Sequence, residues 1–106
     1  MRMTLQKIEE FKICLNEERF YDAHEALETL WFPRRFEADK EIKLLKGFIN
    51  AAVSFELSKR GRKKQSKKVW MNYLKYRQLL FQIDSPHLKH YYQLSRTLDS
   101  LAQKLH

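Results

Sequence analysis

Residues that form tight turns are scarce in this chain. Only two glycines and two prolines occur among its 106 residues. Sandwiches, barrels and dinucleotide-binding folds need glycine in their turns and phosphate loops, so this scarcity excludes them. A hydrophobic content of 43% is enough for a core, and the length is that of one domain. The sequence therefore predicts a single helical domain over residues 1–106, all-α, folded as a compact bundle of four or five helices.

Apolar residues at helical spacing divide the chain into five stretches. These are expected at about 5–15, 19–31, 38–60, 66–82 and 86–106. The fourth is expected to bury Val69, Trp70, Tyr73, Leu74, Leu80 and Phe81. The fifth carries a seam of Tyr91, Leu94, Leu98, Leu101 and Leu105. Two heptads are too short for an independent coiled coil, so this seam closes the bundle or forms a homodimer.

Residues that cap or interrupt helices mark the boundaries. Thr4 is the expected N-cap of the first helix, and Pro33 disfavours helix at the residue before it, which ends the second. Gly61 suits the C′ position of the third helix. At Asp84-Ser85-Pro86 an N-cap side chain precedes a proline at the first position of the fifth.

The third helix is expected to be central. Small residues recur along it at intervals of four, three and four, namely Gly47, Ala51, Ser54 and Ser58. A glycine inside a helix costs about 1 kcal/mol relative to alanine, and close packing of another helix compensates for that cost.

Several features bear on the compartment. The segment from Met1 to Glu10 has acidic residues where a secretory signal needs apolar ones. Cys14 is the only cysteine, so no internal disulfide can form, and a lone thiol beside Ile13 and Leu15 is typical of a small buried hydrophobe. The chain has no apolar run long enough to span a membrane. We expect a cytoplasmic protein without a membrane partner.

Positive charge is concentrated in one segment. The formal net charge is +8, but residues 57–83 carry +9 and no acidic residue, so the rest of the chain sums to −1. The residues expected to bind nucleic acid or another polyanion are Arg60, Arg62, Lys63, Lys64, Lys67 and Lys68. The alternative is a solvated turn between helices, in which these charges serve solubility.

A candidate site lies on the second helix. His24, Glu28 and Trp31 are spaced four and three apart, so they share one helix face. An imidazole and a carboxylate at this spacing can ligate one divalent metal ion, Glu56 is a candidate third ligand, and Trp31 would shield the pocket from water. The alternative is a buried hydrogen-bonded pair between His24 and Glu28.

The same residues do not indicate an enzyme. Reading His24-Glu25-x-x-Glu28 as a zinc-protease motif fails because the second histidine is missing. The sequence offers no independent general base, so we assign no catalytic residue.

Two motifs give the chain a family resemblance. One is the run from Phe20 to Trp31, FYDAHEALETLW, and the other is the run from Leu44 to Ala52, LLKGFINAA. Together they resemble the signature of a small prokaryotic family known as domain of unknown function 309. That signature is His-x-x-x-Glu-x-x-Trp or Tyr, followed by a helix that typically reads Gln-Gly-x-Ile-Gln-x-Ala-x-Ala.

The resemblance covers about residues 16–61. It implies a compact helical bundle with a functional pocket at His24, Glu28 and Trp31, for which metal binding has been suggested, and a packing role for Gly47. The chain departs from the family pattern at Lys46 and Asn50, where glutamine is common. It departs again near Glu56, where relatives often carry histidine, and a carboxylate there favours harder ions.

Three functions follow in order of expectation. The first is binding of a divalent metal or small polar ligand between the second and third helices. The second is a polyanion-binding adaptor acting through residues 59–68, and the third is a homo-oligomeric or partner-binding module without a ligand.

Overall fold

The computed structural model describes the backbone of residues 2–106 and the side chains of residues 4–106. Met1, the first residue of the segment considered for targeting, lies outside the described residues. Five α-helices make up the described chain: α1 (Arg2–Asn16), α2 (Phe20–Trp31), α3 (Lys40–Lys59), α4 (Lys63–Arg77) and α5 (Leu88–Leu105). Two short 3-10 turns, η1 (Phe32–Arg34) and η2 (Gln78–Phe81), follow α2 and α4. No strand occurs within residues 2–106, so the all-α prediction is confirmed.

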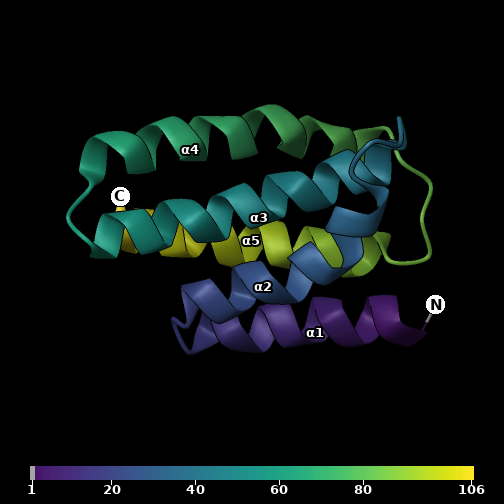
Figure 1. The fold of residues 1–106 in the computed structure, drawn as a ribbon, viewed down its shortest axis with the longest axis horizontal. Coiled ribbons are helices and arrows are strands. Elements are labelled where there is room, and N and C mark those ends of the chain that lie inside the picture. Colours follow the sequence, from purple (N-terminus) through teal and green to yellow (C-terminus); the bar gives the residue numbers. More distant parts are fainter. Residues whose placement is uncertain (1) are drawn as a thin grey trace.

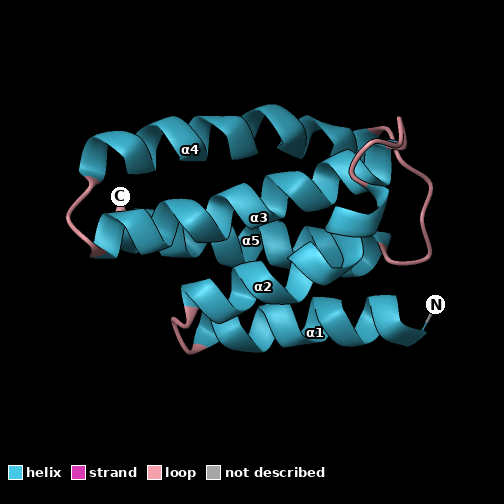
Figure 2. Cartoon of the chain, viewed as in Figure 1, coloured by secondary structure: helices cyan, strands magenta, loops and turns pink. Residues whose placement is uncertain are grey.

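The helices are arranged around α3. Figure 1 shows α1 and α2 side by side on one side of the molecule and α4 on the other, with α3 between them and α5 behind it. Short loops join most neighbours, and a longer one links η2 to α5 (Figure 2). The contacts of α3 with α2, α4 and α5 confirm that it is the central helix.

Aromatic rings on α3 connect the bundle. The ring of Phe48 lies 6.4 Å from that of Phe11, 6.1 Å from that of Tyr73 and 5.7 Å from that of Tyr91. All four residues are buried, and they come from α1, α3, α4 and α5. Burial of each such ring removes a large apolar area from water, which makes this cluster a main source of stability.

The small residues of α3 receive α4 at close range, as predicted. A Cβ atom placed on Gly47 would lie 2.6 Å from the Cβ of Tyr76, so no other residue fits there without a shift. Further along, Ser66 Oγ on α4 donates a hydrogen bond of 2.6 Å to the carbonyl of Ser54. Both serines are fully buried. The close approach of the two backbones offsets the helix propensity lost at Gly47.

At the turn between α3 and α4, the end of α3 is as predicted, but the start of α4 differs. Gly61 has a φ of +79°, and the amides of Arg62 and Gly61 donate to the carbonyls of Leu57 and Ser58 at 2.9 and 3.0 Å. These bonds are the two of a Schellman motif. The next helix begins at Lys63, however, and not at Ser66. Most of the basic residues therefore belong to α4 itself and not to a solvated turn.

The starts of three other helices differ from those predicted. Helix α1 begins at Arg2, so Thr4 lies inside it and is not its N-cap. Helix α3 begins after Asp39, whose carboxylate accepts the amide of Glu41 at 2.7 Å. Helix α5 begins at Leu88 and not at Pro86. The hydroxyl of Ser85 instead accepts the amide of His87 at 3.1 Å.

The seam of α5 faces the core of its own chain. Tyr91, Leu94 and Leu98 are fully buried, and Leu101 and Leu105 pack against the same core. The seam thus closes the bundle, which was the first of its two expected roles. Cys14 is buried, as expected of a small hydrophobe. Within the described residues no helix combines the length and the apolar character needed to cross a membrane.

Candidate functional site

The structure brings His24 and Glu28 together on α2. Nε2 of His24 contacts a carboxylate oxygen of Glu28, and their side chains are 23% and 36% exposed. The ring of Tyr21 meets the imidazole edge-on at 5.9 Å. The pair is therefore partly open to water and is not a fully buried hydrogen-bonded pair.

Trp31 continues this face toward α3. The Nζ of Lys46 lies 4.2 Å from the centre of the indole ring, which is the geometry of a cation–π contact. Trp31 is half-buried against the core. Its exposed face is occupied by the lysine that stands where the resemblance leads one to expect glutamine.

Glu56, on α3, forms an ion pair with Arg60. Its carboxylate accepts a hydrogen bond of 2.8 Å from Arg60 one turn later and borders a surface groove of about 300 Å³ that also includes Phe20, Tyr21 and Lys59. Over the part of the chain that the structure describes, no three His, Cys, Asp or Glu residues are grouped to hold a metal ion. The residues predicted as a three-ligand site are thus not grouped, and Glu56 is paired with Arg60 instead.

The basic segment splits into two parts. Arg60 is held by Glu56 at 2.8 Å, and Lys59 is held by Glu18 at 3.2 Å. Lys63 donates a hydrogen bond of 2.6 Å to the hydroxyl of Ser58. These three cations are therefore engaged within the chain.

The second part is free of such partners. Its members are Arg62, Lys64, Lys67, Lys68 and Lys75, which we call the α4 basic surface. All five are exposed, and none is within ion-pair distance of a carboxylate in residues 4–106. Arg62 directly precedes α4, and the four lysines are exposed residues of α4, the helix at the edge of the bundle in Figure 1.

The backbone of α4 adds to this positive charge. Its first turn contains no acidic residue, and no side chain caps its amino end. The helix dipole already places partial positive charge there, so lysines in the first two turns increase the local potential. This charge also acts on His106, the residue after α5. Burial lowers the pKa of His106, and the positive charges of Lys63 and Lys67 lower it further. An anion is the ligand that such a helix end stabilises.

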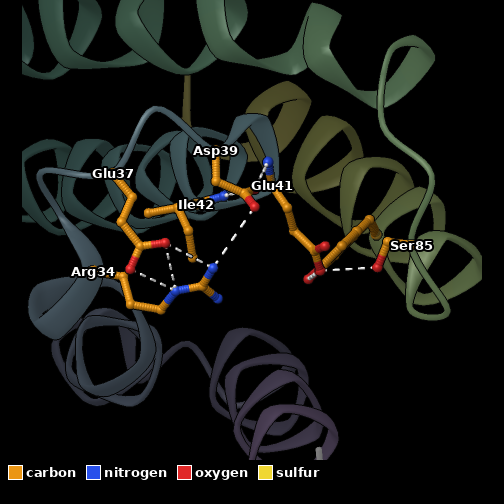
Figure 3. Close-up of polar contacts among 7 residues, drawn as sticks. Arg34, Glu37, Asp39, Glu41, Ile42 and Ser85 are labelled. Carbon is orange, nitrogen blue, oxygen red and sulfur yellow. Dashed lines mark hydrogen bonds and ion pairs between the residues drawn. The ribbon is translucent and has the colours of Figure 1, made fainter.

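One polar cluster was missed by sequence reasoning. As Figure 3 shows, Arg34 forms an ion pair with Glu37, and the carboxylate of Glu41 is hydrogen-bonded to Ser85, which is distant in sequence. The hydroxyls of Ser85 and Tyr91 donate to Glu41 at 2.9 and 2.5 Å. Burial and this carboxylate raise the pKa of Tyr91. A cavity of about 260 Å³ adjoins the cluster. With its hydroxyl partners in place, Glu41 ties the start of α3 to the start of α5.

Another residue was assigned to the wrong environment. Phe81 was expected in the core, but it is 77% exposed. The helical period of α4 ends at Arg77, and the 3-10 turn that follows rotates the later side chains differently. Only Leu80 of that turn is buried.

The fold defines a small all-α bundle with a strongly basic edge helix, and the comparison with known families gives its membership. The chain belongs to the family described as Domain of unknown function (DUF309), which matches residues 8–69. The match includes His24, Glu28 and the basic residues as far as Lys68. No curated protein and no solved structure matches the chain.

Proposed function

We propose that this protein binds a polyanion, with nucleic acid as the expected class, through the α4 basic surface. One observation carries the proposal: four exposed lysines on α4 and Arg62 just before it have no carboxylate partner in residues 4–106, whereas many cations elsewhere are paired. Binding at this surface would break no internal ion pair. It would also relieve repulsion between like charges along the helix.

The expected energetics are those of phosphate contacts. Each lysine or arginine that neutralises a phosphate releases condensed counterions, so affinity falls linearly with the logarithm of salt concentration. Flexible lysine side chains supply point charges without the bidentate geometry that reads base edges. We therefore expect salt-dependent binding with little sequence preference.

The test compares two charge-matched double variants. Lys64→Gln with Lys68→Gln removes two charges from the α4 basic surface, and Lys40→Gln with Lys43→Gln removes two exposed charges from α3. Anisotropy of a labelled DNA strand is titrated over a range of salt concentrations. The α4 variant is expected to lower the salt slope by about 1.4 for a single strand, while the α3 variant leaves it nearly unchanged.

Two results would overturn the proposal. One is no salt-dependent binding of wild type to single-stranded or duplex DNA at low salt. The other is an equal loss of affinity in both variants, since that would attribute binding to net charge and not to this surface. Circular dichroism of both variants verifies that the helical fold is retained.

The second candidate is a site for a divalent metal ion or small polar ligand at His24 and Glu28. The contact between their imidazole and carboxylate, partly open to water, favours it. It ranks second because Glu56 is paired with Arg60 and because no third His, Cys, Asp or Glu among the described residues is grouped with the pair.

Its test is elemental analysis of protein purified without chelator, beside the double variant His24→Ala, Glu28→Ala. Near-stoichiometric metal in the wild type that is lost from a folded variant would support the site. Absence of metal from both, with a destabilised variant, would make the pair a structural one.

A further inference from the structure

A cleft of about 510 Å³ lies between two walls. One wall is formed by the end of α4 and by η2, and the other by α5. Two aromatic rings border it. Phe81 of η2 is 77% exposed and Tyr92 of α5 is 36% exposed, and their ring centres lie 6.2 Å apart. Large exposed rings cost hydration free energy, and a volume in this range is typical of small-ligand sites.

The charged groups that border the cleft are two arginines and one aspartate. Arg77 donates a hydrogen bond of 2.8 Å to Asp99, which neutralises it. Arg96 also borders the cleft, is exposed, and has no carboxylate within ion-pair distance in residues 4–106. The cleft therefore offers flat apolar surfaces beside one uncompensated positive charge.

The cleft lies on the same flank of α4 as Lys67 of the α4 basic surface. Leu74, which borders it, follows Lys67 by seven residues, so both side chains lie on the same flank of α4, about 10 Å apart along the axis. The ring of Trp70, one turn after Lys67, lies 5.3 Å from that of His106, the residue after α5, so this side of α4 faces the end of α5. A backbone bound at Lys67 would thus pass the aromatic pair.

We propose that the polyanion is a single-stranded nucleic acid and that the cleft takes one of its bases. The inference rests on the proposed function. The base stacks on the more exposed ring of Phe81, and the ring of Tyr92, tilted by 58° from that of Phe81, meets the edge of the base. One flanking phosphate meets Arg96, and others follow Lys67 along α4. Aromatic side chains beside a positively charged track are the means by which single strands are bound without sequence preference. A duplex keeps its bases stacked internally and does not offer them.

The experiment separates base from backbone. Anisotropy titrations compare a labelled single strand with an abasic strand of the same length, which keeps every phosphate and lacks every base. Wild type is expected to bind the strand with bases about tenfold more tightly. Phe81→Ala combined with Tyr92→Ala should reduce that affinity to the abasic level and leave abasic binding unchanged.

Two controls accompany this variant. Phe36→Ala removes a phenyl ring that is 88% exposed in the loop after η1, and it should leave the preference for bases unchanged. Phe81→Trp keeps a stacking surface and should preserve that preference. Thermal melts followed by circular dichroism establish that each variant is folded.

The outcomes distinguish the two proposals. Equal affinity of wild type for base-containing and abasic strands, with binding still dependent on Lys64 and Lys68, overturns the base site and leaves the polyanion function standing. Equal affinity for duplex and single strand overturns it as well. Absence of salt-dependent binding to every strand overturns both.

Discussion

The cations at the α1–α2 turn and those on α4 are of the same residue types, yet they differ in their surroundings. At the turn, the carboxylate of Glu18 forms ion pairs with Lys104 at 2.6 Å and with Lys59 at 3.2 Å. Arg19 forms ion pairs with Glu17 and Asp22. The cations of the α4 basic surface have no carboxylate within ion-pair distance among residues 4–106. The positive charges at the turn are therefore neutralised by carboxylates of the same chain, whereas those of the α4 basic surface remain available to bind a partner.

The two faces of α4 extend this comparison. The inner face is tightly constrained, with Tyr76 against Gly47 and Ser66 bonded to Ser54. The outer face carries the lysines. A helix held this firmly on one side can tolerate unfavourable charge on the other, because its position depends on packing and not on its own propensity.

The largest expected effect comes from reversing the free charges. Lys64→Glu, Lys67→Glu and Lys68→Glu together should weaken binding of a DNA strand at low salt by at least about 100-fold, since three phosphate contacts become repulsive. The fold should persist, because all three positions are exposed and a glutamate at position 64, in the first turn of α4, interacts favourably with the helix dipole by about 0.3–1 kcal/mol. Anisotropy and urea denaturation measure the two quantities. Loss of the fold in this variant would contradict the contrast between the two faces.

A second change acts on the inner face alone. Gly47→Ala should decrease the free energy of unfolding by about 1–3 kcal/mol, because the added Cβ meets Tyr76 and forces α4 away from α3. Helix propensity alone predicts the opposite sign, a gain of about 1 kcal/mol. Urea denaturation decides between them, with Asn72→Ala on the exposed side of α4 as the control. A more stable Gly47→Ala variant would show that the close approach is not constraining.

The smallest effect is expected at the α1–α2 turn, where Glu18 is paired with two lysines. Hydrogen bonds from Lys104 and Lys59 lower the pKa of Glu18 from its reference value of 4.5. Its pairing therefore stabilises the fold above about pH 4.5 and is lost as pH falls through the lower folded pKa. Glu18→Gln should lower the urea midpoint slightly at neutral pH and have no effect in acid.

The same variant also probes binding. Freeing Lys59 and Lys104 should raise affinity for a DNA strand modestly if an unpaired cation is what the polyanion requires. Unchanged affinity, measured by anisotropy at low salt, would show that position on α4 matters more than the lack of a partner.

Much of the fold could be predicted from local sequence. The helical periodicity, the stop at Gly61 and the small residues facing α4 were all correct, because each depends on backbone sterics or on neighbours three and four residues apart. The pairing of His24 with Glu28 has the same origin. The start of α4 at Lys63 was not predicted, since apolar periodicity gives no signal in a run of lysines.

The sequence by itself determined that this protein is an all-α bundle and that its positive charge is concentrated in one segment. Only the tertiary structure decided which cations are free, since Glu18 and Lys104 are 86 residues apart and meet only after the helices pack. It also decided that Glu56 pairs with Arg60, and that Phe81 lies exposed beside Tyr92. Ion pairs and clefts depend on the positions of whole helices, which no local pattern encodes.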